Sequence, residues 1–399
     1  MSADRRPHVL FVDHVQRILG GAEVNLIELL AESGTGCDWR ITVACHPEGR
    51  LDEALAGQGI ERRAHGFEDA LGTLRLVGHR FPLWGALRGL RALARCRREL
   101  ATLLREVRPD AVISCTNKDH FAAWPACRAA GIPSVWWVND IVSAEFFPWM
   151  ARRAFLTQAR RGARRLVVVS DFARRVLVDA GLADGRVVTI HNGIPLERYR
   201  RHPRGTLRRL IAAGDSEPVM GIVGRVTPWK GQEFFVRLAE AWCRENAAGR
   251  FVLLGHAFNE DQAFEHRLRE FVRDRRLRER VSFIPFQREV AAALSDLDVM
   301  VHASLKPEPF GRVIIEAMAV GVPVLAANAG GVPEIVTHGR NGYLARPGEI
   351  GEYLAGLRAL IHDPALRERV AREARETVLA RFTVRRVREE FEALVAGVC

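Results

Sequence analysis

Short, nearly continuous apolar runs alternate with longer stretches of helical periodicity along most of the chain. Runs of this kind are typical of parallel strands that are covered on both faces. Before residue 195 the candidate strands are 8–14, 39–46, 111–117, 134–140, 165–171 and 187–193. After residue 218 they are 219–226, 250–257, 281–287, 299–304 and 323–330. The pattern therefore predicts an α/β protein built on parallel sheets.

Helical stretches fall between these strands. The candidate helices are 22–32, 86–107, 231–246 and 262–278, with a last helix over about 366–396. Alternating βα units indicate doubly wound sheets, and the units are too numerous for one sheet.

A polar, basic segment at 198–218 separates the two sets of strands. We expect two Rossmann-like domains facing across a cleft. The first domain is predicted over 1–200 and the second over 201–375, and the C-terminal helix over 376–399 is expected to return to the first domain.

Size and composition agree with two domains. The chain has 399 residues, 48% of them hydrophobic, and no stretch of 18 residues is free of charge, so no transmembrane helix is expected. The start of the chain runs directly into a strand without the apolar core of a signal peptide. The seven cysteines lack metal-ligand spacing and are expected to be reduced. We therefore expect a cytoplasmic protein, with peripheral attachment to the inner face of the membrane as an alternative.

The chain is strongly basic, with a net charge of +11. A basic protein attracts phosphates, nucleic acids or anionic membranes. Nucleic acid is the weaker interpretation, because no zinc finger, RNP-like signature or basic tail occurs. The segment 75–108 is basic and amphipathic and contains Phe81 and Trp84, which suggests contact with an anionic membrane, although an ordinary packing helix is the more common explanation.

Candidate chemistry gathers where two strands of the second domain end. Ligands of open α/β sheets bind beyond the carboxyl ends of the strands. Arg225 and Lys230 follow the strand 219–226, and Lys230 is one of only three lysines. Glu308 follows the strand 299–304, so the two loops are expected to share one edge of the sheet.

Gly311 opens the helix after Glu308, and Glu316 lies within that helix among apolar residues. A helix N-terminus and two cations suit a pyrophosphate, and two carboxylates suit the hydroxyls of a sugar and a ribose. A nucleotide-sugar satisfies all these features. The alternatives are that Arg225 is an ordinary surface charge and that Glu316 pairs structurally with a buried arginine.

The first domain offers a second phosphate contact. Gly20 and Gly21 follow the first strand and precede an apolar helix, and glycines permit close approach of a ligand to the backbone. The absence of G-x-G-x-x-G and G-K-[ST] counts against an NAD enzyme and a P-loop NTPase.

These motifs together resemble one known family. The segment from Glu308 to Glu316 matches the E-x7-E motif of the family 4 retaining glycosyltransferases, which have the GT-B fold. The segments GRVTPWKGQEFF, HNG at 191–193 and GGVPEIV at 330–336 also resemble segments of that family, in the expected order. The resemblance spans nearly the whole chain.

The resemblance implies a mechanism and roles. Transfer would retain the anomeric configuration without a bound metal or other cofactor. Arg225 and Lys230 would stabilise the leaving diphosphate, Glu308 would bind hydroxyls of the donor sugar, and Glu316 would hold the ribose. The backbone N–H groups that would help hold the sugar and phosphate are those around Phe310, Gly311, Arg312 and Val313.

One position departs from the family pattern. Many relatives have a histidine followed by an acid after an apolar strand, where this chain has Asn139 and Asp140. These two residues are predicted to face the acceptor or the donor sugar. His14, His120 and His191 are candidates to replace the missing imidazole.

The sequence thus predicts a metal-independent hexosyltransferase that uses a nucleotide-sugar donor and a sugar, lipid-linked or small-molecule acceptor. The alternatives are a sugar-nucleotide epimerase, a sugar phosphorylase and a non-catalytic nucleotide-sugar-binding protein.

Overall fold

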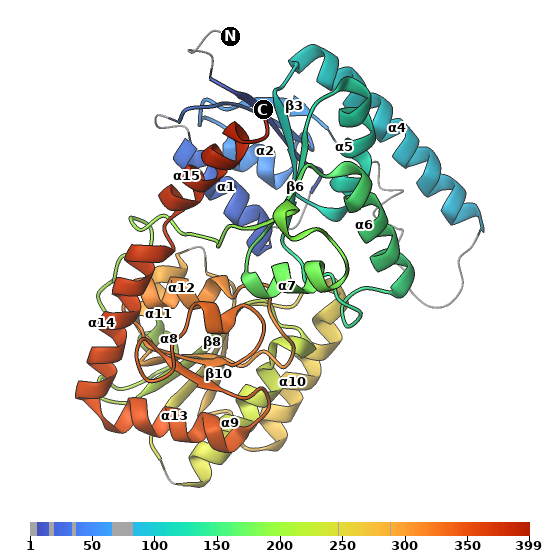
Figure 1. Cartoon of the computed structure of the whole chain (residues 1–399). Helices are drawn as coiled ribbons and strands as arrows, with labels where there is room; N and C mark the ends of the chain where they lie inside the picture. The colour runs from blue at the N-terminus through green and yellow to red at the C-terminus, as the bar shows by residue number, and fades with distance from the viewer. Residues whose placement is uncertain (1–5, 16–19, 34–36, 66–82, 246, 288) are drawn as a thin grey trace. The chain divides into compact units, whose positions relative to one another are not determined.

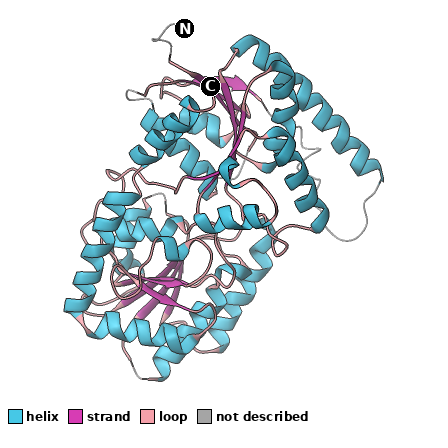
Figure 2. Cartoon of the chain, viewed as in Figure 1, coloured by secondary structure: helices cyan, strands magenta, loops and turns pink. Residues whose placement is uncertain are grey.

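The computed structural model describes residues 6–15, 20–33, 37–65, 83–245, 247–287 and 289–399. It divides into two units. Unit 1 contains Met1–His191 and Val384–Cys399, and unit 2 contains Asn192–Thr383. Each unit is a parallel sheet enclosed by helices, as Figures 1 and 2 show. The predicted pair of doubly wound parallel sheets is confirmed.

Unit 1 has a seven-stranded sheet in the order β3-β2-β1-β4-β5-β6-β7. Its strands are β1 (His8–Asp13), β2 (Arg40–Cys45), β3 (Glu61–Ala64), β4 (Ala111–Ser114), β5 (Ser134–Val138), β6 (Arg165–Val168) and β7 (Val187–Thr189). Its helices are α1 (Gly21–Ser33), α2 (Arg50–Leu55), α4 (Leu83–Val107), α5 (Asn117–Ala130), α6 (Trp149–Gly162), α7 (Asp171–Asp179) and α15 (Val384–Ala396), with a 3₁₀ turn at Asp184–Arg186.

The apolar run of β1 covers both faces of the unit 1 sheet, because successive side chains of a strand point to opposite sides. Val9 and Phe11 pack in a cluster with side chains of α1, α2 and α15. Leu10 and Val12 pack in a second cluster with side chains of α4 and α5. Burial on both sides explains why the strand is hydrophobic throughout.

Unit 2 has a six-stranded sheet in the order β10-β9-β8-β11-β12-β13. Its strands are β8 (Val219–Val223), β9 (Arg250–Leu254), β10 (Val281–Ile284), β11 (Val299–His302), β12 (Val324–Ala327) and β13 (Tyr343–Ala345). Its helices are α8 (Thr206–Leu210), α9 (Gln232–Arg244), α10 (Gln262–Asp274), α11 (Val290–Ser295), α12 (Arg312–Ala319), α13 (Ile350–His362) and α14 (Pro364–Arg381). Its 3₁₀ turns are Pro228–Lys230, Asn259–Asp261 and Val332–Glu334.

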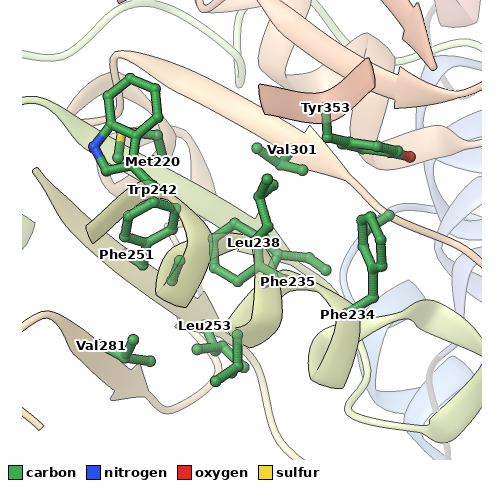
Figure 3. Close-up of a cluster of buried hydrophobic side chains, with 14 of the residues drawn as sticks. Met220, Phe234, Phe235, Leu238, Trp242, Phe251, Leu253, Val281, Val301 and Tyr353 are labelled. Atoms are coloured by element: carbon green, nitrogen blue, oxygen red, sulfur yellow. The ribbon is translucent and has the colours of Figure 1, made fainter. Parts of the chain in front are cut away.

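One hydrophobic cluster of unit 2 joins α9, α10 and α13 to the sheet. Figure 3 shows aromatic side chains of α9 lying against the strands. Phe235 meets Phe251 of β9 with ring centroids 5.5 Å apart, and Phe234 meets Tyr353 of α13 at 5.0 Å. The Tyr353 hydroxyl donates to the carbonyl of His302 at 3.0 Å, which fixes the carboxyl end of β11.

Three expectations about elements are corrected. The last helix is interrupted, because Phe382 is buried and Thr383 pairs with Ile194 in a β-bridge, so α14 ends at Arg381 and α15 starts at Val384. β3 was missed, since its side chains are mostly exposed and form no apolar run, and β13 was missed because it has only three residues.

The boundary between the units also differs from the predicted residue 200. It lies at His191/Asn192, and α15 returns to unit 1 from residue 384 rather than 376. The reason is that the segment after β7 already belongs to unit 2, where the Tyr199 hydroxyl donates to Glu316.

Within the described ranges, no helix has both the length and the apolarity needed to cross a membrane. The seven cysteines, all of which are described, are free thiols.

Candidate active site

The predicted residues of unit 2 lie at the point where the order of its strands reverses. The chain runs outward from β8 through β9 to β10, then returns to β11 on the other side of β8. Since β8 and β11 are parallel neighbours, the loops that follow them leave the same edge of the sheet. Ligands of doubly wound sheets bind at such a switch point.

Glu308 receives three hydrogen-bond donors on one carboxylate oxygen, Oε1. Lys230 Nζ lies 2.6 Å from this oxygen, and His302 Nε2 lies 2.8 Å from it. The third donor is the hydroxyl of Ser304. Glu308, His302 and Ser304 are buried, and Lys230 is half-buried. We name these four residues the Glu308 cluster.

The charge of Glu308 is compensated within the cluster. Burial by itself raises the pKa of a carboxyl group, but Lys230 and His302 outweigh this effect and hold the pKa of Glu308 well below its ordinary value. Glu308 is therefore an ionised carboxylate, which can only accept hydrogen bonds, such as those from sugar hydroxyls.

Two glycines allow the backbone to close around the Glu308 cluster. Gly231 has φ +79°, and a Cβ there would lie 1.9 Å from the carbonyl oxygen of Ala303. Gly330 has φ +65°, and a Cβ there would lie 2.2 Å from the carbonyl oxygen of Glu308. The GGVPEIV segment thus packs on the Glu308 backbone, and the Gly331 N–H donates to the same carbonyl at 2.9 Å.

Arg225 lies on the loop after β8 but does not join the Glu308 cluster. Its side chain is exposed, and its guanidinium carbon lies 5.6 Å from the ring centroid of Phe258. Its carbonyl accepts from the side chain of Gln232 at 2.8 Å, so the backbone of the loop is fixed while the guanidinium faces solvent.

Glu316 is half-buried in α12, and its carboxylate accepts hydrogen bonds from two side chains. Arg312, one turn earlier, donates from Nε to Glu316 Oε1 at 2.7 Å, and the Tyr199 hydroxyl donates to the same oxygen at 3.0 Å. The ion pair with Arg312 corresponds to the alternative in which Glu316 has a structural role as the partner of an arginine. A ribose hydroxyl that binds Glu316 would join or replace these donors.

The N-terminus of α12 borders the Glu308 loop. Gly311 precedes the helix with φ +107°, and no side chain caps it. Phe310 is buried against Phe382, with ring centroids 5.7 Å apart, so only its backbone is placed to meet a ligand. Val313 is half-buried in the first turn of the helix.

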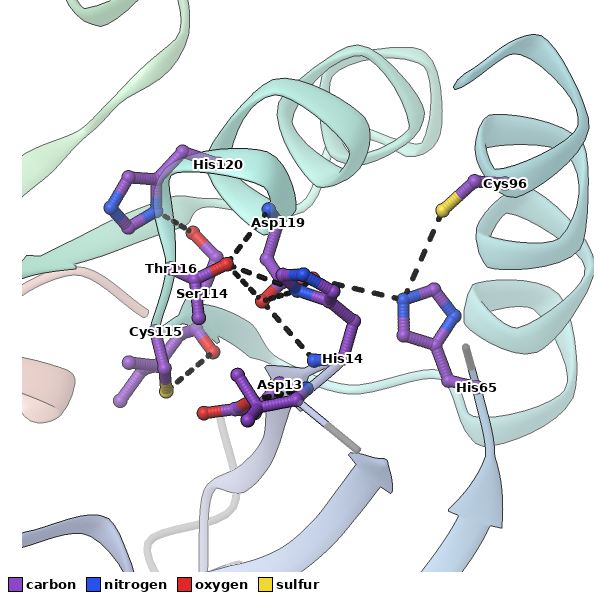
Figure 4. A network of polar contacts seen from close by, with 11 residues as sticks. Asp13, His14, His65, Cys96, Ser114, Cys115, Thr116, Asp119 and His120 are labelled. Carbon is purple, nitrogen blue, oxygen red and sulfur yellow. Dashed lines mark hydrogen bonds and ion pairs between the residues drawn. The ribbon is translucent and has the colours of Figure 1, made fainter. Parts of the chain in front are cut away.

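Unit 1 has its own polar cluster at the corresponding switch point, between β1 and β4 (Figure 4). Asp119 is fully buried in the first turn of α5. His14 Nδ1 lies 3.1 Å from both of its carboxylate oxygens, and the Thr116 hydroxyl donates to Oδ2 at 2.7 Å. We name Asp13, His14, Thr116 and Asp119 the Asp119 cluster.

The two acids of the Asp119 cluster have opposite pKa shifts. Burial and the nearby charge of Asp119 raise the pKa of Asp13 to about 7. Burial also acts to raise the pKa of Asp119, but His14 outweighs it and the pKa is lowered. Burial acts to lower the pKa of His14, but Asp119 outweighs it and the pKa is raised. The ligand atoms of Asp13, His14 and Asp119 lie within 4.8 Å of one another, which is the spacing of a small cation site.

The predicted glycine loop of unit 1 lies at the start of α1. The Gly20 N–H donates to the Glu23 side chain, so a carboxylate occupies the position where a phosphate was predicted. Burial raises the pKa of Glu23. A Cβ at Gly21 would meet no atom within 4 Å, so packing inside the protein does not require glycine there.

Asn139 and Asp140 follow β5 at the same edge of the unit 1 sheet. Asn139 is half-buried, and the exposed Asp140 accepts from the side chain of Asn117 at 2.8 Å.

Of the candidate histidines, His14 belongs to the Asp119 cluster. His120 is buried, stacks on Trp136 with ring centroids 4.8 Å apart, and burial lowers its pKa to about 3, which makes it a core residue. The backbone carbonyl of His191 accepts from Arg386 of α15.

The sequence reasoning did not identify His302, Ser304, Thr116 or Asp119. A signal was present for the first two, since His302 and Ser304 are polar residues at the end of an otherwise apolar strand, six and four residues before Glu308.

Comparison with known proteins agrees with this arrangement. A family model described as glycosyl transferases group 1 matches residues 204–377, and a model described as glycosyltransferase family 4 matches residues 19–198. Together these models span every strand of the two sheets except β1. The chain belongs to the family 4 glycosyltransferases. The resemblance stated from the E-x7-E motif is thus confirmed.

Among curated members of the family, a D-inositol 3-phosphate glycosyltransferase of Nocardia farcinica is 32% identical over 206 residues. That match covers 50% of this chain and 46% of the relative. A GDP-mannose-dependent alpha-mannosyltransferase of Mycobacterium tuberculosis is 30% identical over 268 residues, covering 64% of each chain. The matched part is thus about half to two-thirds of the length of these relatives.

Solved glycosyltransferase structures match over nearly the whole chain. HepE of Anabaena in complex with UDP and glucose has a TM-score of 0.82 and 27% identity, covering 98% of this chain and 99% of that one. The sucrose-phosphate synthase of Thermosynechococcus elongatus has a TM-score of 0.76 at 19% identity, with 98% and 99% coverage. The predicted GT-B fold is confirmed.

Proposed function

We propose that the protein transfers a hexose-type sugar from a nucleotide-sugar to an acceptor hydroxyl, with retention of the anomeric configuration. The observation that carries this proposal is the Glu308 cluster. It combines a cation and an ionised carboxylate at the switch point of unit 2, near the N-terminus of α12, and Arg225 lies on the same loop as Lys230. Membership of the family and the likeness to HepE, which was solved with UDP and glucose, support it.

In this proposal the leaving diphosphate binds to the cationic side of the site. Lys230 and Arg225 supply positive charge, and the helix N-terminus at Gly311, Arg312 and Val313 supplies N–H donors. Charge develops on the diphosphate as its bond to the sugar breaks, so donors that are already in place lower the barrier. Glu308 accepts from hydroxyls of the sugar, and Glu316 accepts from the ribose.

The reaction exchanges one bond at the anomeric carbon for another. The bond from this carbon to the diphosphate oxygen breaks, and the bond to the acceptor oxygen forms on the same face. The acceptor proton passes to an oxygen of the leaving diphosphate, so the protein needs no separate base.

A bound metal or other cofactor is not part of this proposal, since Lys230 and Arg225 provide the charge that a cation would otherwise supply. The acceptor is assigned to unit 1, where Asn139 and Asp140 lie at the carboxyl edge of the sheet. Gly20 and Gly21 follow β1 at the same edge and stay proposed contacts of the donor phosphate.

Contact with an anionic membrane through 75–108 stays a proposal, and 75–82, which include Phe81, lie outside the described residues. The described part of this segment favours the interpretation of an ordinary helix that packs on the core of unit 1. Leu100, Leu103 and Leu104 are buried in the unit 1 core, and the exposed face of α4 carries arginines. An apolar face that is already covered cannot enter a bilayer, so a membrane contact would have to be made elsewhere in 75–108.

The alternatives differ in what they require. An epimerase forms product without an acceptor, a phosphorylase depends on inorganic phosphate, and a binding protein consumes no donor. The test is turnover of UDP-glucose, GDP-mannose, ADP-glucose and dTDP-glucose, read as released nucleoside diphosphate, with and without sugar and polyol acceptors. We expect acceptor-stimulated release from one donor by the native protein and a release about 10²–10³-fold slower by Lys230→Ala. Release from no donor, or epimerised donor in the absence of acceptor, would contradict the proposal.

A further inference from the structure

The Glu308 cluster contains more donors than a charge pair needs. Lys230, His302 and Ser304 all reach the same oxygen, Oε1. No described residue donates to the second oxygen, Oε2, and Oε2 is not among the buried atoms of the described chain that lack a hydrogen-bond partner, so it is not fully covered. The carboxylate is thus held by one oxygen, and the other remains for a ligand.

The three donors differ in how firmly the fold holds them. His302 ends β11 and Ser304 follows two residues later; both are almost fully buried. The carbonyl of His302 also accepts from Tyr353, which ties this strand end to α13. Lys230 is longer, keeps 24% of its side chain exposed and lies over the Trp229 ring at 4.5 Å. It is the donor of the three that can turn toward a ligand.

A diphosphate at the proposed donor site competes with Glu308 for Lys230, because both are anions. When Lys230 moves toward the diphosphate, Glu308 loses its nearest cation, and a buried carboxylate without partners is costly. His302 and Ser304 remain in place, since a ligand does not displace buried groups of a strand end.

The geometry of His302 suits this task. A carboxylate oxygen only accepts, so Nε2 carries the hydrogen that points to Glu308. The other ring nitrogen, Nδ1, is buried and has no hydrogen-bond partner among the described residues. Glu308 is therefore the hydrogen-bond partner that the ring is oriented to meet, apart from the Ser304 hydroxyl at 3.3 Å.

We propose that His302 and Ser304 are positioning residues that keep Oε2 of Glu308 directed at the donor sugar after Lys230 has turned to the diphosphate. The inference rests on the proposed function and extends it to two residues. It divides the site into a part that binds the diphosphate and a part that orients the sugar-binding carboxylate.

The inference predicts that a change at His302 affects the affinity for a nucleotide-sugar but not the affinity for a nucleoside diphosphate. A nucleoside diphosphate has no sugar for Glu308 to hold, so its binding should not depend on His302. A nucleotide-sugar gains affinity from Glu308 and should lose it when His302 cannot donate. The loss of one hydrogen bond to a charged group corresponds to about a tenfold change or somewhat more.

The experiment measures dissociation constants of UDP, GDP, UDP-glucose and GDP-mannose by calorimetry for the native protein, His302→Leu, His302→Gln and Ser304→Ala. The matched control is Ser295→Ala, which removes a buried hydroxyl of unit 2 that bonds the backbone of Ala291 and His202 instead of Glu308. For His302→Leu we expect unchanged binding of the diphosphate, nucleotide-sugar binding weakened about tenfold and a lower kcat. His302→Gln should restore most of the loss, because its amide N–H can donate to Glu308.

If His302→Leu weakened the binding of diphosphate and nucleotide-sugar equally, His302 would have a general structural role and the inference would be overturned. The inference would also be overturned if the affinity for nucleotide-sugar relative to diphosphate were the same in His302→Leu and the native protein. If His302→Leu does not fold, Ser304→Ala and His302→Gln decide in the same way: Ser304→Ala should weaken only the nucleotide-sugar, and His302→Gln should retain near-native binding. A native protein that binds none of the four ligands would instead reject the proposed function itself, and with it this inference.

Discussion

Two buried acids occupy comparable places in the two units and have opposite pKa shifts. Asp13 ends β1 beside the switch point of unit 1, and Glu308 follows β11 beside the switch point of unit 2. The pKa of Asp13 is raised to about 7, and the pKa of Glu308 is lowered. Burial by itself raises the pKa of both carboxyl groups, so the difference between them comes from the neighbouring charges.

Those neighbours explain the different chemistry of the two sites. Glu308 has Lys230 and His302 against it, whereas Asp13 has Asp119 and Glu23 nearby, and His14 is held by Asp119. Unit 2 therefore combines a fixed negative charge with a cation that a diphosphate can compete for. Unit 1 has an acid that changes its charge near neutral pH. The switch points of two doubly wound sheets thus differ in charge because a few side chains differ.

The largest expected effect comes from removing the cation of the Glu308 cluster. Lys230→Ala should lower donor turnover by about 10²–10³-fold, the usual result of losing one group that stabilises charge in the transition state. The measurement is nucleoside diphosphate release at saturating donor. Arg244→Ala, which removes an exposed cation of α9, is the control and should leave the rate unchanged. Equal rates for native protein and Lys230→Ala would exclude the assigned role.

Glycine substitutions compare the backbones of the two sites. Gly231→Ala should lower the stability of unit 2 by more than about 1 kcal/mol, because φ is +79° and the new Cβ meets the Ala303 carbonyl. Gly21→Ala in unit 1 should stay within about 0.5 kcal/mol, since its Cβ meets nothing. Denaturant unfolding of both variants checks this. Comparable losses in the two would mean that the loops are equally constrained.

The low pKa of Glu308 predicts that the folded protein loses stability as the pH falls below about 4.5. Its ionised form stabilises the folded state above the unfolded pKa of about 4.5, and this contribution is lost as the pH falls below that value. Glu308→Gln lacks the contribution and leaves Lys230 without its carboxylate. The stability difference between native protein and variant should therefore shrink between about pH 5 and pH 3 in denaturant titrations. A difference that is constant with pH would contradict the shift.

The raised pKa of Asp13 predicts a smaller effect of opposite sign. The folded state keeps this proton up to about pH 7, while the unfolded state releases it above about 3.8, so stability falls as the pH rises between these values. Asp13→Asn removes this loss and retains an acceptor for the Val15 N–H. Its Tm at about pH 8 should exceed the native value by about 2–4 °C and equal it at about pH 4. Glu106→Gln, an exposed acid of α4, should show no such dependence.

The sequence was sufficient for the fold because its main signals are local. Continuous apolar strands and alternating helices predict doubly wound sheets, and the switch-point rule places Lys230 and Glu308 at one edge. β3 could not be predicted, because its exposed side chains lack periodicity, and the break at Phe382 depends on a tertiary contact with Ile194. Lys230 and His14 lie 78 and 105 residues before the acids that they pair with, Glu308 and Asp119, so local spacing does not reveal these two pairs.

The most direct test of the account is the thermal shift of native protein, Lys230→Ala and Asp13→Asn with UDP-, GDP-, ADP- and dTDP-sugars at about pH 8. A ligand that binds the folded state raises the Tm by mass action. The account predicts that one class of nucleotide-sugar stabilises the native protein and Asp13→Asn, and that Lys230→Ala loses this shift. No shift with any of the four from folded native protein, or a shift that Lys230→Ala retains in full, would contradict the assignment of the donor site to the Glu308 cluster.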